Sequence, residues 1–368
     1  MRNHLLILLF LSVLAEAKYL SNESCSECHE KIYDEFQGSA HSKTYFNDEL
    51  HRKVADAVST KAYDCAPCHM PMADNLKDLI VGKARPDKNN LTHTDAISCF
   101  FCHTIASVKK SHKYQENVSA RQAEGFKPTL FGGLLKADQT DKHSSVRSPI
   151  YNKNACKGCH TFKLNDYNVT IFRAINDDED SVECIKCHMP HIKGGNEKMN
   201  KKARTEHISH RFLGIHDAEF RKKGMDINIT YSDPELHVML TNKTVHPLII
   251  QAARAKFLKI KVIRKGTVIW QNYQHDPTED KQGYFAYSFS KNGKKIIIPA
   301  TATEGRVNNI AAKSTKTLTY NIPKLQKGDT VSVSFYVQLA KDDCVEAIDL
   351  KEKSLTAPML IKEVVLEL

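Results

Sequence analysis

The sequence has 368 residues and a formal net charge of +10, with 53 basic and 43 acidic residues. A chain of this length forms about two domains on average. The charge excess alone identifies neither a nucleic-acid partner nor a membrane surface. No stretch after the first twenty residues approaches the roughly twenty apolar residues of a membrane-spanning helix, so no transmembrane segment is predicted.

The N-terminal segment has the pattern of a secretory signal peptide. A basic start at Arg2 is followed by an apolar run over residues 5–14 and by Ala15-Glu16-Ala17, a cleavage site of the A-x-A type. We therefore expect residues 1–17 to be removed and the mature chain to begin near Lys18. No cysteine lies at the cleavage point, which argues against a lipid anchor. The expected location is the periplasm, with the outer surface as a further option.

Ten of the eleven cysteines belong to one repeated motif, Cys-x-x-Cys-His. The copies are Cys25-x-x-Cys28-His29, Cys65-x-x-Cys68-His69, Cys99-x-x-Cys102-His103, Cys156-x-x-Cys159-His160 and Cys184-x-x-Cys187-His188. In this motif the two thiols attach haem covalently and the histidine is the proximal iron ligand. Zinc ribbons need two Cys-x-x-Cys units per metal and no histidine after each unit. We therefore predict five covalently bound c-type haems, with Cys344 left over as an unpaired thiol.

The haem prediction also accounts for the basic composition. Five haems would bring about ten propionate charges, which would leave the loaded protein close to neutrality. The excess of lysine and arginine then compensates the cofactor, and we predict no nucleic-acid partner.

The second axial position of each iron decides between electron transfer and catalysis, because a histidine there saturates the iron and an empty position admits a small molecule. Twelve histidines remain in the mature chain after the motif histidines are set aside. Nine of them lie in the cysteine-rich region, and only His237, His246 and His275 lie beyond it. Met70 and Met189 directly follow motif histidines, so each could reach only a neighbouring haem.

Several segments around the motifs resemble the multihaem cytochrome c superfamily that includes the tetrahaem cytochrome associated with hydroxylamine oxidation. The resemblance covers residues 20–216. The segments that carry it are the first motif with Phe36-Gln37-Gly38-Ser39-Ala40-His41, then His143 and Ser148-Pro149 ahead of Cys156, and then His210-Arg211-Phe212-Leu213-Gly214. The resemblance implies His41, His143 and His210 as distal iron ligands, and His93, just ahead of Cys99, ranks next.

The same resemblance separates this chain from the pentahaem nitrite reductases. Those enzymes typically replace the histidine of one motif by lysine at the catalytic haem. All five motifs here end in histidine. The sequence therefore departs from the reductase signature, and the catalytic interpretation loses support.

The composition predicts two domains of different kinds. The spacers between motifs, such as residues 84–90, are polar and cannot form a core of their own. We therefore expect residues 18–223 to form a mainly α-helical and irregular domain wrapped around the haems. Haem would replace the missing apolar core, so folding and haem attachment would be coupled.

From Asp226 onward the hydrophobic pattern changes to a period of two. Residues 258–262 and 331–335 alternate between apolar and polar, which predicts strands. Residues 264–267 are a plausible hairpin turn before a strand at 268–270. Apolar runs at 296–298 and 364–366 predict further strands. Several short strands predict an all-β sandwich over residues 224–368.

The sequence as a whole predicts a periplasmic or surface-exposed pentahaem cytochrome that passes electrons along its haems. Its partners would be other cytochromes or a membrane quinol-linked donor, and an oligomer or filament is left open. The alternative is a multihaem oxidoreductase that acts on a small nitrogen or sulfur compound at a haem with an open axial site. We favour the non-catalytic carrier because the motifs and the surplus of histidine suit saturated irons.

Overall fold

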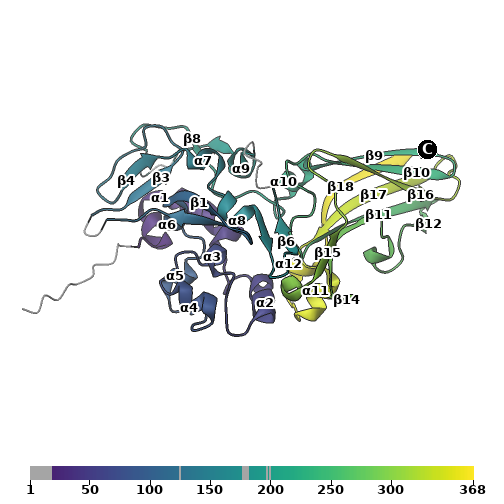
Figure 1. Cartoon of the computed structure of the whole chain (residues 1–368). Helices are drawn as coiled ribbons and strands as arrows, with labels where there is room; N and C mark the ends of the chain where they lie inside the picture. Colours follow the sequence, from purple (N-terminus) through teal and green to yellow (C-terminus); the bar gives the residue numbers. More distant parts are fainter. Residues whose placement is uncertain (1–18, 124–125, 176–181, 196–197, 199) are drawn as a thin grey trace, which may run out of the picture.

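The structure, a computed structural model, describes residues 19–123, 126–175, 182–195, 198 and 200–368. The predicted signal peptide, residues 1–17, lies outside the described residues. Two regions follow each other along the chain (Figure 1). The cysteine-rich region, residues 19–223, carries most of the helices and several small sheets, and the β-rich region, residues 224–368, carries two larger sheets. None of the described helices is long and apolar enough to span a membrane.

The helices of the cysteine-rich region are mostly one or two turns long. Several begin at a polar side chain that accepts a hydrogen bond from the first turn: Ser21 caps α1, Ser98 caps α6 and Asp217 caps α10. Their bounds are α1 (Asn22–Gln37), η1 (Ala40–Ser42), α2 (Glu49–Val58), α3 (Ala66–His69), α4 (Leu76–Val81), α5 (Leu91–Thr94), α6 (Cys99–Cys102), α7 (Ile150–Lys153), α8 (Lys157–His160), α9 (Cys184–His188) and α10 (Ala218–Lys223).

The cysteine-rich region also contains four two-stranded sheets that the sequence did not predict. They pair β1 (Ile105–Lys110) with β2 (Gln115–Ser119), β3 (Thr129–Gly132) with β4 (Ser144–Arg147), β5 (Phe162–Leu164) with β6 (Thr170–Arg173), and β7 (His191–Lys193) with β8 (Glu206–Ile208). Only the β3–β4 pair is parallel. Six of these strands have only three or four residues, and the six-residue β1 does not alternate, which explains why the pattern missed them.

A small apolar cluster forms between α2, α3 and α4, and this corrects the expectation that the polar spacers build no core. Tyr63, Met70 and Leu79 are almost completely buried in it, and Ala84 packs against it from the spacer 84–90. Burial of such side chains contributes about 1.5–3 kcal/mol each. The cluster holds the second motif, whose Ala66 is also fully buried, in place next to α2.

The β-rich region contains a three-stranded sheet and a seven-stranded sheet. The first has the order β16-β10-β9; the second has the order β14-β13-β11-β17-β18, with β12 paired to β11 and β15 paired to β13. The bounds are β9 (Met225–Ser232), β10 (Glu235–Asn242), β11 (Ala255–Arg264), β12 (Thr267–Gln271), β13 (Tyr284–Lys291), β14 (Lys294–Ile296), β15 (Glu304–Val307), β16 (Thr315–Asn321), β17 (Thr330–Gln338) and β18 (Met359–Glu367). Short helices η2 (Pro277–Glu279), η3 (Pro299–Thr301), α11 (Asp342–Ala347) and α12 (Lys353–Thr356) complete the region, which is therefore β-rich and not all-β.

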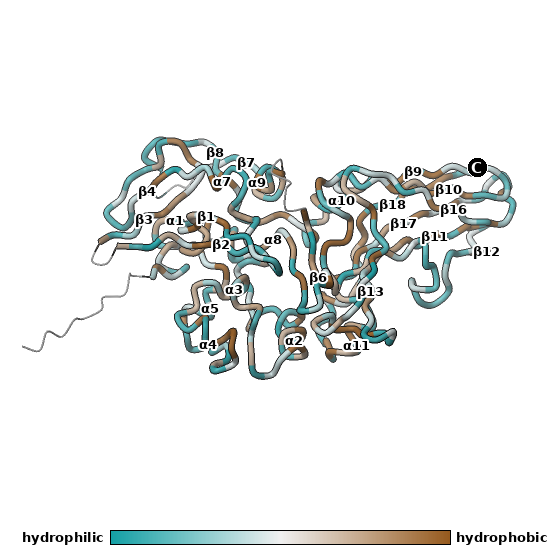
Figure 2. The backbone as a smooth tube through the Cα atoms, viewed as in Figure 1, coloured by the Kyte–Doolittle hydropathy of each residue, from teal (hydrophilic) through white to brown (hydrophobic). Residues whose placement is uncertain are grey.

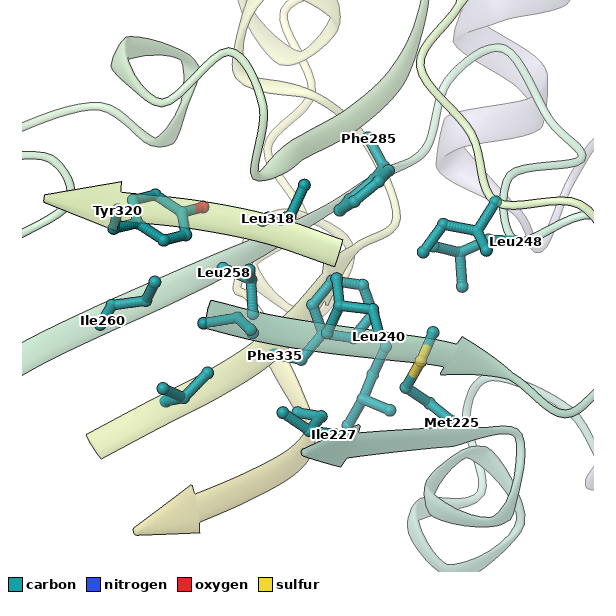
Figure 3. Packing of buried hydrophobic residues seen from close by; sticks show 14 of the residues in the cluster. Met225, Ile227, Leu240, Leu248, Leu258, Ile260, Phe285, Leu318, Tyr320 and Phe335 are labelled. Atoms are coloured by element: carbon teal, nitrogen blue, oxygen red, sulfur yellow. The ribbon is translucent and has the colours of Figure 1, made fainter. Parts of the chain in front are cut away.

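Both sheets contribute apolar side chains to one buried cluster (Figure 3). Leu240 comes from β10, Leu258 and Ile260 from β11 and Phe335 from β17, and all four are at most 1% exposed. The alternation predicted over residues 258–262 is confirmed, because every second residue of β11 there is buried. In Figure 2 the polar loop between β12 and β13 is teal and lies outside this core.

The predicted turn between β11 and β12 is confirmed. Lys265 and Gly266 occupy the left-handed region, with φ of 50° and 79°, as a two-residue hairpin turn requires. The predicted strand at residues 296–298 is wrong for two of its three residues. β14 ends at Ile296, because Pro299 starts the 3₁₀ helix η3 and the two preceding isoleucines pack on the cluster around α11.

The two regions are joined by backbone hydrogen bonds through β6. Arg173 N donates to Ile250 O at 3.0 Å, and Ala252 N donates to Ile171 O at 3.2 Å. Val169, just ahead of β6, is part of the core of the β-rich region. In Figure 1, β6 lies at the junction of the two regions.

Candidate haem-binding site

Each of the five motifs lies on or directly ahead of a helical turn. The motifs are numbered here as sites 1 to 5 in chain order, and they lie on α1, α3, α6, α8 and α9. Residues three and four apart share one face of a helix. The two thiols and the histidine of each motif therefore face the same side, as attachment of one flat group requires.

Thiols of different motifs lie next to each other in three places. The neighbouring pairs, in which one thiol perturbs the pKa of the other, are Cys25 with Cys99, Cys68 with Cys159, and Cys156 with Cys184. Site 1 is therefore adjacent to site 3, site 2 to site 4, and site 4 to site 5. Cys102 of site 3 also interacts electrostatically with both cysteines of site 4. The five motifs form one connected group.

Three motif histidines face another histidine at a characteristic distance. The ring-centroid separations are 6.3 Å for His29 and His143, 5.8 Å for His160 and His41, and 6.2 Å for His103 and His210. Two imidazoles bound on opposite sides of one metal, each about 2 Å from it, have centroids about 6 Å apart. The spacing at sites 1, 3 and 4 thus fits one iron between each pair.

The hydrogen bonds of these histidines fix how the rings are oriented. His103 Nδ1 pairs with Phe131 O at 2.7 Å, and His210 Nδ1 pairs with Ile208 O at 2.8 Å. When Nδ1–H donates to a carbonyl, Nε2 keeps its lone pair for a metal. This arrangement fits the residues to the role of axial ligands.

His41 is the clearest case of a side chain that lacks a protein partner. Its Nδ1 is buried and has no hydrogen-bond partner in the described part of the chain. Burial, followed by the nearby His160 and His188, lowers the pKa of His41 to about 3. Burial likewise lowers the pKa of His210 to about 4. Both imidazoles are therefore neutral at physiological pH, the form that binds iron.

Site 2 is different from the other sites. His69 and His51 stack at a centroid distance of 3.8 Å and an interplanar angle of 21°, which leaves no room for a metal between them. His51 Nε2 is hydrogen-bonded to the Tyr63 hydroxyl at 2.7 Å. None of the ring contacts among the described residues places a histidine about 6 Å from His69.

A cavity of about 390 Å³ adjoins site 2. Its lining includes Pro67 of the second motif, Pro71 just after it, Phe101 of the third motif and Asn117 of β2. The space beside the motif thus suits a flat apolar group with a polar edge. Nothing in the sequence singled out His51 or Tyr63, because neither lies in a motif and both reach the site through tertiary packing.

The structure does not bring His93 together with a motif histidine. His93 is 1% exposed, and its Nδ1 accepts a hydrogen bond from the Asp87 backbone N–H at 3.0 Å. Its Nε2 pairs with Asn75 Oδ1 at 2.8 Å. Both ring nitrogens are thus engaged with protein, and a ligand role for His93 stays a prediction.

Comparison with known proteins supports covalent haem attachment. Residues 24–104, which contain the first three motifs, match the sequence family described as cytochrome c554 and c-prime. No curated protein matches the chain. The resemblance to multihaem c-type cytochromes that the motifs indicated is therefore confirmed for this part of the chain, whereas the relation to hydroxylamine oxidation stays a prediction.

The fold is shared with a solved structure along almost its whole length. The chain is similar to a penta-heme cytochrome c552 from Thermochromatium tepidum, with a TM-score of 0.76 and 22% sequence identity. The match covers 95% of this chain and 99% of that one. Both regions described above are thus present together in that protein.

Proposed function

We propose that this protein is a pentahaem c-type cytochrome that carries electrons outside the cytoplasm. The observation that carries the proposal is the set of three histidine pairs, each containing a motif histidine, with centroids 5.8–6.3 Å apart. Bound haem would supply a one-electron couple at each site. Electron transfer by covalently attached c-type haem is also what the family match and the fold support.

Contacts between motif cysteines support electron transfer from site to site. The Cys25–Cys99 contact joins site 1 to site 3, and Cys102 lies close to site 4. Site 4 in turn contacts site 2 through Cys159 and site 5 through Cys156. Site 4 is therefore a branch point, and electrons entering at site 1 would have a continuous route to site 5.

The proposal includes the location and the partners inferred from the sequence. Residues 1–17 would direct export to the periplasm, and residues 18–223 and 224–368 would be the haem domain and the β-rich domain. The partners would be other cytochromes or a membrane quinol-linked donor.

Intact mass and absorption spectroscopy of the exported protein test the haem count. We expect five haems per wild-type chain, four when Cys156 and Cys159 are both replaced by serine, and five in the matched variant Cys344→Ser. Cys344 is buried in the β-rich region and belongs to no motif, so its loss removes one thiol without removing an attachment site. A haem count that did not follow the motif cysteines would contradict the proposal.

A second candidate function concerns site 2 alone. The stacked His51 and His69 leave the far side of site 2 without a histidine, so a small nitrogen or sulfur compound could bind there. This would make the protein an oxidoreductase at one haem and a carrier at the others. The cavity beside Pro67 and Pro71 supports access to this site.

Carbon monoxide binding to the fully reduced protein tests the second candidate. We expect about one carbon monoxide per five haems in the wild type. The variant His51→Ala should leave this number unchanged, because His51 is not opposite the iron position. If wild-type protein bound no carbon monoxide and only His51→Ala did, His51 would be an axial ligand and site 2 would be a carrier site.

A further inference from the structure

Site 5 has no histidine partner among the pairs described above, although His188 belongs to a complete motif. His188 is held by its neighbours in the same way as His103: Nδ1 pairs with Leu213 O, and Leu213 N donates to His188 O at 2.9 Å. The His188 ring also packs against Phe220, with centroids 5.1 Å apart. The segment from Leu213 to Phe220 therefore forms one wall of site 5.

The next residues along this wall contact a loop of the β-rich region. Lys243 N donates to Gly224 O at 2.9 Å, directly after α10. A methyl group added to Gly224 would lie 3.2 Å from the Thr244 methyl, so the two segments are in close contact. The loop of residues 243–247 thus adjoins the wall of site 5.

This loop holds His246 in a fixed position. Asn242 is completely buried, and its Nδ2 donates to His246 O at 2.9 Å. The Thr244 hydroxyl donates to the same oxygen at 2.7 Å. A backbone carbonyl held by two side chains leaves little freedom for the residue that carries it.

The His246 ring has the hydrogen-bond pattern of the axial histidines. Its Nδ1 pairs with Pro247 O at 3.0 Å, as His103 and His210 pair with Phe131 O and Ile208 O. No hydrogen bond of Nε2 is found in the described part of the chain. Burial is the main cause of the lowered pKa of His246, and a smaller electrostatic contribution from His188 places the two rings near each other.

Other histidines near site 5 suit the role less well. His216 lies on the same wall, but the charged groups that affect its pKa after burial are Arg254, Lys43, Asp48 and Arg221, and His188 is not among them. His191 is exposed on β7. His246 therefore remains the histidine whose free ring nitrogen and neighbours both suit site 5.

We infer that His246, from the β-rich region, is the second axial ligand of the iron at site 5. The inference rests on the proposed function, because it requires haem at site 5. It means that the β-rich region completes an iron site in the cysteine-rich region. Electron transfer through site 5 would then depend on correct docking of the two regions.

Electron paramagnetic resonance of the oxidised, fully loaded protein tests the inference through the ratio of low-spin to high-spin iron. With site 2 open, we expect four low-spin irons and one high-spin iron in the wild type. The variant His246→Ala should have three low-spin and two high-spin irons. The variants His216→Ala and His275→Ala should both keep the wild-type ratio.

The variant His246→Met provides a second test that does not empty the site. Methionine ligates haem iron and raises its reduction potential relative to histidine. We therefore expect the wild-type spin ratio, with the potential of one haem shifted upward in spectroelectrochemical titration. A wild-type ratio in His246→Ala together with unchanged potentials in His246→Met would overturn the inference. Mass spectrometry on the same samples distinguishes this result from a failure of the five-haem proposal, which would appear as fewer than five haems.

Discussion

A histidine can serve a metal only if one ring nitrogen keeps its lone pair and is not used in another hydrogen bond. This rule divides the histidines of the chain. His207 pairs with Gly194 O through Nδ1 and with Glu35 through Nε2, so it has no nitrogen left. His41 is buried without any partner for its Nδ1 and faces the ring of His160. The number of histidines in the sequence does not show which of them keep a ring nitrogen free for a metal.

The contrast between His41 and His207 gives a direct prediction at this scale. The variant His41→Ala should convert about one of the five irons from low-spin to high-spin, because site 4 loses its second ligand. His207→Ala is the matched control, since its ring is also largely buried but fully hydrogen-bonded. Electron paramagnetic resonance with spin integration measures both. An unchanged ratio in His41→Ala would remove His41 from site 4.

The haem-attachment residues could be predicted from the sequence, but the ligand pairs could not. Attachment depends on a local pattern, because the two thiols and the proximal histidine lie on one helical turn. The distal ligands depend on tertiary structure. His41 follows the first motif closely, yet it faces His160 of the fourth motif, while His143 faces His29. The resemblance to known cytochromes pointed to His41, His143 and His210 without indicating which motif each one would face.

At the scale of secondary structure, the period of two was informative only where strands are long and half-buried. Burial alternates over residues 258–262 of β11 and 330–333 of β17, and strands were predicted over residues 258–262 and 331–335. The pairs β3–β4 and β7–β8 have strands of three or four residues, so they have no measurable period. Neighbouring motifs hold these strands in place. Phe131 N of β3, for example, donates to His103 O, and Phe131 O pairs with His103 Nδ1. Contacts with the motifs determine these strands, so the strands cannot be predicted from their own sequence until the sites are known.

An ion pair ties the end of β11 to the start of β17. The Arg264 guanidinium donates to both carboxylate oxygens of Asp329, at 2.9 and 2.7 Å, and the Gln326 backbone N–H donates to Asp329 at 2.8 Å. The Arg264 hydrogen bond lowers the pKa of Asp329. Asp329 is 2% exposed, so these bonds are shielded from water.

The pH dependence of stability tests this pair. Because the folded-state pKa of Asp329 is depressed, its stabilising contribution is present above the unfolded-state pKa of about 4 and is lost as pH falls through the folded-state value. Asp329→Asn should lower the unfolding temperature of the β-rich region by a few degrees at pH 7, and the difference from wild type should shrink at pH 3. Asp233→Asn, whose partner Lys324 is exposed, is the control and should change little. Far-ultraviolet circular dichroism gives the midpoints; a pH-independent difference would contradict the argument.

At the scale of the whole molecule, the two regions share more than a covalent link. The segment that precedes β6 inserts into the β-rich region, where Val169 joins the core and Asn165 is 7% exposed. Asn165 Nδ2 donates to Pro299 O and Ala302 O, both at 2.8 Å. Its Oδ1 accepts from the backbone of Tyr167 and Val169. One side chain thus connects the loop between β5 and β6 to the β-rich region.

The variant Asn165→Ala tests whether this connection supports the haem sites. The substitution leaves buried carbonyl and N–H groups without hydrogen-bond partners. Each such group destabilises the fold by about 1–3 kcal/mol if no water replaces the lost hydrogen bond. We expect a lower unfolding temperature and, because only the short segment that contains β5 separates His160 from Asn165 along the chain, greater access of carbon monoxide to haem in the reduced protein. Asn228→Ala, an exposed position on β9, is the matched control. If Asn165→Ala lowered the unfolding temperature but left carbon monoxide binding at the wild-type level, docking would stabilise the fold without protecting the haem sites. The β-rich region would then affect site 5 only through the loop that carries His246, because loss of the Asn165 hydrogen bonds would not change access to the irons.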